Sequence, residues 1–145
     1  LAKRTLGPLT SRVRLHEGTI DVAPDGPFDG ATCLLTLHFL PREERLRTLI
    51  ALRRRLRPGA PFAVAHHSFP QDPERKALWL ERFAAFAVMS GVPAAQMPGA
   101  IAAIGDRLPA LSPEDDEALL REAGFEDVAL FYAGFTFRGW IAYAP

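Results

Sequence analysis

The chain has 145 residues, enough for one domain. Lys plus Arg and Asp plus Glu number 17 each, so the formal net charge at pH 7 is zero, which argues against a nucleic-acid module with a strongly basic surface. No apolar run approaches the ~20 residues of a membrane span. The single cysteine, Cys33, excludes an internal disulfide framework and a multi-cysteine zinc site. No signal-peptide pattern is visible, so we expect a cytoplasmic protein.

The N-terminal part predicts a helix end, a short strand and a buried strand. The first residues read as the last turns of a helix ending at Gly7, which suggests that residues upstream are missing. Residues 12–16 alternate between polar and apolar, as in a short strand. Residues 21–27 are rich in turn formers. Residues 31–37 are nearly all apolar or small, which predicts a strand buried on both faces, as in a parallel sheet.

A crossover helix and a second buried strand follow. Pro41 opens the helix at its first turn, and Pro58-Gly59 stops it. Residues 61–68 read as the next buried strand. Two helices, at 74–90 and near 98–107, then form a helical insertion over about 73–108.

The C-terminal part predicts a capped helix and a hairpin. Ser112 is an N-cap with Pro113 at the first helical position, and Gly124 lies at the C-terminal cap. The strands 127–135 and 136–144 are linked so tightly that they should be antiparallel neighbours. The predicted order, β–β–α–β–α–α–β–β, indicates a single α/β domain over residues 1–145, with a parallel sheet that ends in an antiparallel hairpin.

Four segments match one family in order and spacing. They are Glu17-Gly18-Thr19-Ile20, the stretch from Phe28-Asp29 to Leu37-His38-Phe39-Leu40-Pro41, the turn Leu56-Arg57-Pro58-Gly59-Ala60, and Ala123-Gly124-Phe125. In combination they resemble the class I S-adenosylmethionine (SAM) dependent methyltransferases, and they cover almost the whole chain.

The chain's ending, AGFEDVALFYAGFTFRGWIAYA, gives a narrower resemblance. With Arg42 to Arg45 and the SFPQD segment, it is similar to the branch containing the carboxy-SAM tRNA wobble-uridine enzymes. In those enzymes, a basic residue in the region after strand five binds the extra carboxylate of the cofactor. Residues 84–105 contain no Lys or Arg, so we expect ordinary SAM. The neutral net charge likewise makes a tRNA substrate unexpected.

The resemblance implies a Rossmann-like sheet of order 3-2-1-4-5-7-6, with strands 1 and 2 absent from this chain. The glycine-rich loop and the acidic residue that hold the cofactor in the family would lie upstream. Without those strands, a strand at 31–37 would expose an unpaired apolar edge. Two βα units of ~30 residues each correspond to about 60 absent residues. Alternatively, a partner chain supplies the two missing strands.

The resemblance also places the cofactor near the carboxyl ends of the strands. The expected cofactor-binding residues are Gly18, Thr19, Ile20, Cys33, Leu34 and His38. Thr19 stands where the family often has Asp to bind the adenine amino group, and Leu34 stands where the related branch has Asn. Cys33 has the alternative reading of a small core residue.

Three histidines are candidates for catalysis. His38, His66 and His67 titrate near neutrality, and each has the alternative of a packed structural role. His66 and His67 are adjacent in a strand and point to opposite faces, so they do not suit a shared metal ion, and no metal site is expected. The arginine-rich helix from Pro41 is interpreted as a solvated face.

Acceptor binding is expected after strand five and on the insertion. The candidates are Ser68, Phe69, Trp79 and Phe83, with an amphipathic core stripe as the alternative for the last two.

The resemblance implies SAM-dependent methyl transfer to a small molecule. The alternatives are a non-catalytic methyltransferase-like partner or scaffold, and a tRNA-modifying enzyme; a dinucleotide oxidoreductase is disfavoured by the LRPGA turn and the AGF segment. The aromatic C-terminal hairpin could form a homodimer edge.

Overall fold

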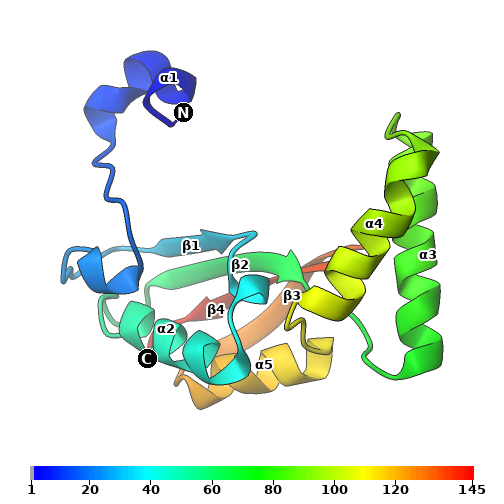
Figure 1. Ribbon diagram of the computed structural model, residues 1–145. Coiled ribbons are helices and arrows are strands. Elements are labelled where there is room, and N and C mark those ends of the chain that lie inside the picture. Colours follow the sequence, from blue (N-terminus) through cyan, green and yellow to red (C-terminus); the bar gives the residue numbers. More distant parts are fainter. Residues whose placement is uncertain (1) are drawn as a thin grey trace.

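Four strands form one mixed sheet in the computed structural model of the protein, which describes residues 2–145 (Figure 1). In chain order they are β1 (Ala31–Leu34), β2 (Pro61–His67), β3 (Glu126–Gly134) and β4 (Phe137–Tyr143). The spatial order is β1-β2-β4-β3, with β1 and β2 parallel and the other two pairs antiparallel. The predicted α/β class, the parallel pair and the C-terminal antiparallel hairpin are confirmed.

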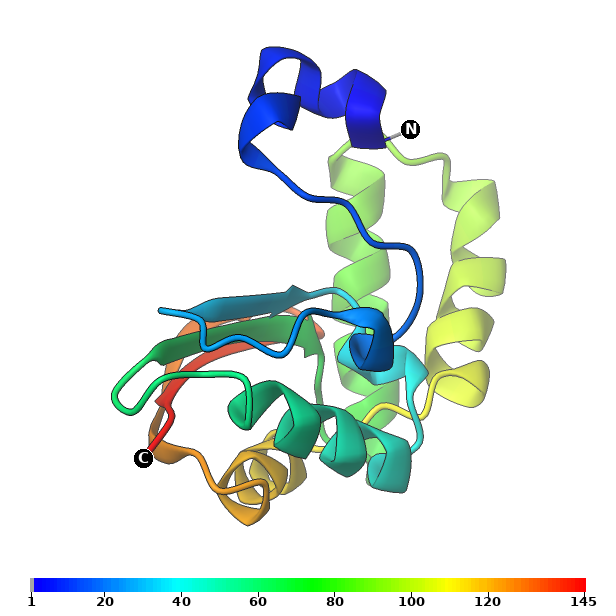
Figure 2. The ribbon, with the colours of Figure 1, turned by 90° about the vertical axis from the view of Figure 1, so that its left-hand side faces the viewer.

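Two helices cover one face of the sheet. They are α2 (Arg42–Arg53), which connects β1 to β2, and α5 (Pro113–Glu122), which precedes β3 (Figure 2). The Ser112 side chain accepts a hydrogen bond from the Asp115 N–H at 3.1 Å, and the chain leaves α5 through Gly124 with φ of 89°. Both predicted caps are confirmed.

The core lies between these helices and the sheet. In register, Phe62 faces Ala142 and Val64 faces Trp140, so alternate residues of β2 and β4 point toward the helices. Buried leucines of α2 and α5 complete the core. Trp140 is fully buried, and its indole N–H donates to Glu117 Oε1 at 3.1 Å. The indole therefore fills the layer while its polar edge stays satisfied.

The opposite face of the sheet is open over its first strands. Thr32, Ala63 and Ile141 line a shallow depression of about 410 Å³ there. The prediction of a strand buried on both faces at 31–37 is therefore wrong: β1 is four residues long and alternates between half-buried and exposed. Within the described residues, no strand pairs with its outer edge, so Leu34 is 58% exposed.

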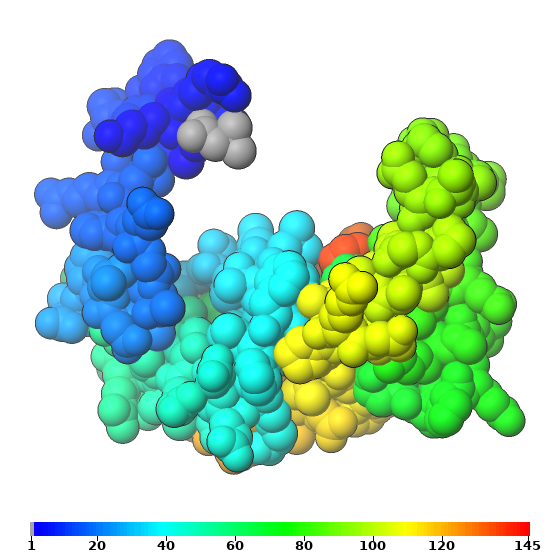
Figure 3. Space-filling model, viewed as in Figure 1, coloured from blue at the N-terminus to red at the C-terminus, as the bar shows by residue number. Residues whose placement is uncertain are grey.

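The N-terminal segment stands away from the body (Figure 3). Helix α1 (Ala2–Leu6) ends at Gly7 with φ of 52°, as predicted, and a 3₁₀ segment (Gly7–Arg12) follows. The predicted strand at 12–16 is wrong, because its alternating residues meet no neighbouring strand and stay exposed. A short 3₁₀ turn, Ile20–Val22, interrupts the expected loop at 21–27.

The insertion forms a pair of neighbouring helices beyond the end of the sheet (Figure 1). Helix α3 (Pro73–Met89) begins at Asp72, whose side chain accepts from the Arg75 N–H at 3.0 Å. Helix α4 (Met97–Ala102) continues into a π-turn, Ala103–Arg107. Both predicted helices are present. Within residues 2–145, no helix combines the length and apolar character needed to cross a membrane.

The strands β3 and β4 are joined by a two-residue turn, Phe135-Thr136. Gly134 pairs with Phe137 across it, and Phe135 adopts φ of 53°. Thr136 is fully buried, and its carbonyl accepts from the Ser68 N–H at 2.8 Å. The turn is therefore bound to the end of β2.

Candidate functional site

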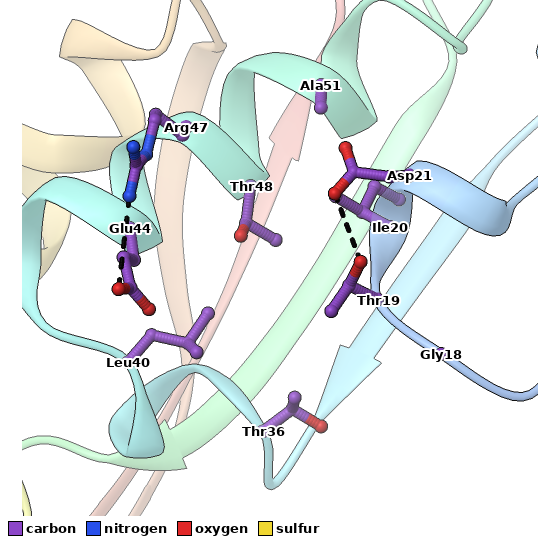
Figure 4. Close-up of a pocket in the computed structure, with 10 residues that line it drawn as sticks. All are labelled: Gly18, Thr19, Ile20, Asp21, Thr36, Leu40, Glu44, Arg47, Thr48 and Ala51. Atoms are coloured by element: carbon purple, nitrogen blue, oxygen red, sulfur yellow. Dashed lines mark hydrogen bonds and ion pairs between the residues drawn. The ribbon is translucent and has the colours of Figure 1, made fainter.

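A cavity of about 610 Å³ lies beside the carboxyl end of β1 (Figure 4). Three segments form it: the stretch before β1, the turn after β1, and one face of α2. The lining residues are Gly18, Thr19, Ile20, Asp21, Thr36, Leu40, Glu44, Arg47, Thr48 and Ala51. Three residues that the sequence predicts for cofactor binding, Gly18, Thr19 and Ile20, line this cavity. The volume lies within the range of small-molecule sites.

The cavity combines apolar walls with a few polar groups. Thr19 Oγ1 donates to Asp21 Oδ2 at 3.1 Å, and Glu44 lies 3.9 Å from Arg47 across one turn of α2. Ile20 and Leu40 supply apolar surface. A flat group with polar edges can be held in such a site, because the acids and hydroxyls bind its edge and the aliphatic groups contact its faces.

Sequence reasoning misses Asp21 and the α2 face. Asp21 is a carboxylate two residues after Thr19, close to the position where the family often has Asp. The α2 residues at positions 44, 47, 48 and 51 follow one helical face, a spacing that could have indicated a shared surface. The residue types at these four positions do not by themselves indicate a binding surface.

The other predicted cofactor residues lie apart from this cavity. Cys33 lines a second cavity of about 430 Å³, which it shares with Gly18, Thr19 and Ile20. Burial raises the pKa of the Cys33 thiol, although a hydrogen bond with Thr36 lowers it, so the thiol stays protonated at neutral pH. Leu34 and His38 line neither cavity.

The three predicted catalytic histidines come together at the ends of β1 and β2. The His38 ring lies 6.3 Å from the His66 ring and 4.9 Å from the His67 ring, between centroids, and all three side chains are buried. His66 faces α5 and Trp140, whereas His67 faces Phe83 of α3. The prediction that His66 and His67 point to opposite faces is confirmed.

His38 occupies a position that a strand would otherwise fill. Strand β1 ends at Leu34, which pairs with Ala65 of β2. Two residues further along β2, the His67 N–H has no strand partner, and it donates to His38 Nδ1 at 3.2 Å. Because a buried N–H requires an acceptor, this bond fixes the orientation of the His38 ring.

His67 has a different partner. Its Nδ1 lies 2.9 Å from Thr136 Oγ1, and its ring stacks on Phe137 with centroids 4.0 Å apart. Burial, and after it the nearby histidines, lower the pKa of His38 to about 4, and burial together with His66 lowers the pKa of His67 to about 4. Both rings are therefore neutral at neutral pH.

These two pKa values predict an acid-sensitive fold. Unfolded histidines bind protons near pH 6.5, whereas folded His38 and His67 bind them only near 4, so the unfolded state holds more protons between these values. The free energy of unfolding should be constant above about pH 7 and should fall as the pH drops from about 6.5 to 4. Urea unfolding at several pH values measures this slope.

The matched variants for this experiment are two glutamine substitutions. His67→Gln removes one of the two histidines with a lowered pKa, so the free energy of unfolding should depend less steeply on pH. His16→Gln, at an exposed histidine, should leave that dependence unchanged. An equal slope in the wild type and in His67→Gln would contradict the assignment.

A buried charge network lies behind the histidines. Arg45 pairs with Asp116 Oδ1 and donates to the Pro109 carbonyl at 3.0 Å, while His66 Nε2 lies 3.2 Å from Asp116 Oδ2. Burial acts to raise the pKa of Asp116, but His66 and Arg45 outweigh it and the pKa is lowered. Reading the whole arginine-rich helix as a solvated face is therefore wrong for Arg45, which is fully buried.

The predicted acceptor residues divide into two groups. Ser68 and Phe69 are completely buried, and the Phe69 N–H donates to the Leu111 carbonyl at 3.2 Å. Phe83 lies edge-on to His67, with ring centroids 5.8 Å apart. Trp79 contacts the guanidinium groups of Arg82 and Arg138, at 5.1 and 4.9 Å from the ring centroid. Among the described residues, Phe83 is the one of these four that makes a ring contact with the histidine cluster.

The fold of the chain is similar to that of several solved structures. No family model and no curated protein matches the sequence. The S-adenosylmethionine-dependent methyltransferase SibL, in its apo form, superposes with a TM-score of 0.69 at 20% identity, covering 99% of this chain and 40% of that one. An O-methyltransferase family 2 protein from Planctomyces limnophilus in complex with apigenin gives 0.67 at 16% identity, covering 99% and 39%. Human N-acetylserotonin methyltransferase in complex with SAM gives 0.61 at 16% identity, covering 92% and 34%.

The match covers nearly all of this chain but less than half of each neighbour. The chain spans 34–40% of the length of these three structures. The narrower resemblance to the carboxy-SAM branch stays a prediction. At such identities the likeness establishes the architecture: the chain has the fold of the corresponding part of the class I S-adenosylmethionine-dependent methyltransferases.

Proposed function

We propose that the chain forms the cofactor-proximal and acceptor-binding part of a SAM-dependent methyltransferase that acts on a small molecule. The observation that carries the proposal is the cavity beside β1, because it joins Gly18, Thr19 and Ile20 to Thr36 and Leu40, which follow the carboxyl end of that strand. Ligands of open α/β sheets bind at this position.

We propose that the sheet corresponds to the last four strands of the family order. On this assignment β1, β2, β4 and β3 are strands 4, 5, 7 and 6. Strands that carry the glycine-rich loop would then pair with the free edge of β1, whether they come from upstream residues or from a partner chain. The exposed side chains of β1 and the open face beside it support this assignment.

The residues around the cavity fit the adenosine part of SAM. Asp21 and Thr19 offer oxygen acceptors for the adenine amino group, and Ile20 and Leu40 offer apolar contacts for the ring faces. SAM supplies an electrophilic methyl group on a sulfonium. The chain's part is to hold the acceptor in line with that group, and positioning of this kind provides most of the rate. On the acceptor side, Phe83 and His67 lie edge-on to each other and form an aromatic surface.

The test is binding of SAM and of its demethylated product by isothermal titration calorimetry. We expect saturable binding of both to the protein. Ala51 lies half-buried in the cavity wall, so Ala51→Phe should fill the adenine position and weaken binding at least tenfold, about 1.4 kcal/mol.

Ala118→Phe is the matched control, because Ala118 is an exposed alanine on α5 away from the cavity. It should bind both ligands like the wild type. Absence of binding in the wild type, or equal affinities of the wild type and Ala51→Phe, would refute the site.

The free edge of β1 favours a second candidate, a non-catalytic methyltransferase-like partner. An unpaired strand edge is a ready template for another chain, and Thr19 in place of Asp weakens the adenine site. This candidate predicts a stable hetero-complex. It also predicts that the wild type, Ala51→Phe and Ala118→Phe all fail to bind SAM. The same titration, with light scattering for the assembly state, separates the two candidates.

A further inference from the structure

We propose that Arg45 is a positioning residue that holds two segments at a fixed spacing: the turn at the end of the cofactor cavity, and the segment through which the chain leaves the helical insertion. The inference rests on the proposed function, because these segments belong to the cofactor side and the acceptor side of that same site. The connection itself follows from contacts within the chain.

The first contact of Arg45 is with the turn between β1 and α2. Thr36 and Leu40 of this turn line the cavity together with Thr19 and Ile20 (Figure 4). Nη2 of Arg45 donates to the Leu40 carbonyl at 3.4 Å. Arg45 itself lies on the buried face of α2, outside the cavity lining. The backbone at Leu40 is therefore held from behind, by a side chain that cannot touch the ligand.

The second contact is with the exit of the insertion. The same Nη2 donates to the Pro109 carbonyl at 3.0 Å, in the segment that leads from the π-turn Ala103–Arg107 to α5. Two residues further on, the Leu111 carbonyl accepts from the Phe69 N–H at the end of β2. The exit is thus fixed to α2 on one side and to β2 on the other. Because α3 packs against α4 and the π-turn, this anchor also holds the helix that carries Phe83.

Asp116 of α5 sets the direction of the guanidinium. Its Oδ1 accepts from Nη1 of Arg45, which leaves Nη2 for the two carbonyls. A guanidinium is planar and rigid, so fixing one of its terminal nitrogens also fixes the other. A lysine offers a single ammonium on a flexible stem and cannot reproduce this geometry.

Stability alone does not account for an arginine at this place. Arg45 Nε is fully buried and has no hydrogen-bond partner among the described residues, which costs free energy. An apolar pair of similar volume commonly replaces a buried ion pair without loss of stability. Such a pair could fill the space, but it could not hold the carbonyls of Leu40 and Pro109. The bridge between these carbonyls is what the arginine adds.

The test on the cofactor side compares variants in which stability and the bridge change separately. Arg45→Met, Asp116→Leu removes the bridge together with both charges, so most of the stability should be kept. Isothermal titration calorimetry should nevertheless show SAM binding that is weaker by about five- to tenfold, the equivalent of one net hydrogen bond. Arg45→Lys, which keeps the charge opposite Asp116, should show the same loss and serves as the second variant.

Phe125→Leu is the matched control with the opposite pattern. Phe125 is buried in the core, where its ring stacks on Phe62 with centroids 5.0 Å apart, and it lies outside the cavity lining. This variant should be less stable than the wild type and should bind SAM with unchanged affinity. Affinity that followed stability across these variants would show that Arg45 has a merely structural role.

Hydrogen exchange of the protein without ligand tests the bridge directly. The Leu40 amide donates to the Leu37 carbonyl at 2.9 Å, and the Phe69 amide donates to the Leu111 carbonyl at 3.2 Å. Both amides should exchange about five- to tenfold faster in Arg45→Lys and in the double variant, because the segments that they tie lose a hydrogen bond. The Ala144 amide, which donates to the Ala60 carbonyl at the other end of the sheet, should be unaffected.

Two results would overturn the inference: unchanged exchange at Leu40 and Phe69 in both variants, or a double variant that binds SAM as tightly as the wild type. Failure of the proposed function has a different signature, because the wild type would then bind no SAM. The exchange rates, measured without ligand, would still decide whether Arg45 holds the two segments.

Discussion

Replacing Arg45 by methionine is expected to lower the free energy of unfolding by about 3–5 kcal/mol, because it leaves a buried carboxylate without its guanidinium partner. Arg45 is fully buried and Asp116 is 2% exposed, so water cannot take over the lost ion pair. The Pro109 carbonyl loses its donor as well. Urea unfolding at neutral pH measures the loss.

Two further variants define the cause. The double variant Arg45→Met, Asp116→Leu removes both charges and should recover most of the loss, because an apolar pair of similar volume is tolerated where a single charge is not. Arg47→Met, on the same helix with its side chain 75% exposed, should change stability by less than about 0.5 kcal/mol. A double variant as unstable as Arg45→Met would show that packing, rather than the unpaired charge, dominates.

The loss of stability caused by Arg45→Met should become smaller at low pH. In the wild type, the lowered pKa of Asp116 contributes stability above its ordinary value of 3.8, and this contribution is lost as the pH falls through the folded value. Without Arg45 that pKa rises, so the carboxyl protonates at a higher pH and the unpaired charge disappears. The difference between wild type and Arg45→Met should therefore narrow toward low pH.

Truncation of Trp140 to alanine should cost about 3–5 kcal/mol, through the lost apolar burial and the cavity that remains. Trp140 is fully buried between Val64 of β2 and the α5 helix, where Glu117 accepts its indole N–H. The site has little freedom to collapse, because a sheet forms one wall and a helix the other. Denaturant unfolding followed by far-ultraviolet circular dichroism gives the value without depending on the tryptophan signal.

Met89→Ala is the control for this prediction, since Met89 is 88% exposed at the end of α3. Its effect should be within about 0.5 kcal/mol. Trp140→Phe retains most of the volume but lacks the N–H, and should lie between the two. If Trp140→Ala proved as stable as Met89→Ala, the core would have to lie elsewhere.

Local chemistry explains which elements the sequence could predict. Ser112-Pro113 and Gly124 determine the ends of α5 through caps made within a few residues, and the two-residue link between β3 and β4 leaves only an antiparallel arrangement. The strand expected at 12–16 has the alternation of a strand but no neighbour in the described chain, and alternation cannot supply one.

The site was predictable in part, for the same reason. His66 and His67 share a strand, so their opposite directions follow from the period of two. The approach of His38 to both rings depends on where β1 ends. Arg45 and Asp116 lie 71 residues apart in sequence, and nothing in either segment marks the pair. The α2 wall of the cavity has ordinary surface residues whose role comes from the segment that lies opposite.

The turn Phe135-Thr136 limits how the hairpin can vary in length. Surface hairpin loops usually tolerate inserted residues, because loop-closure entropy grows slowly with length. Here the carbonyl of Thr136 accepts from Ser68 while its hydroxyl contacts His67. One additional residue would shift the register of both contacts together. We therefore expect an inserted residue at this turn to destabilise the fold.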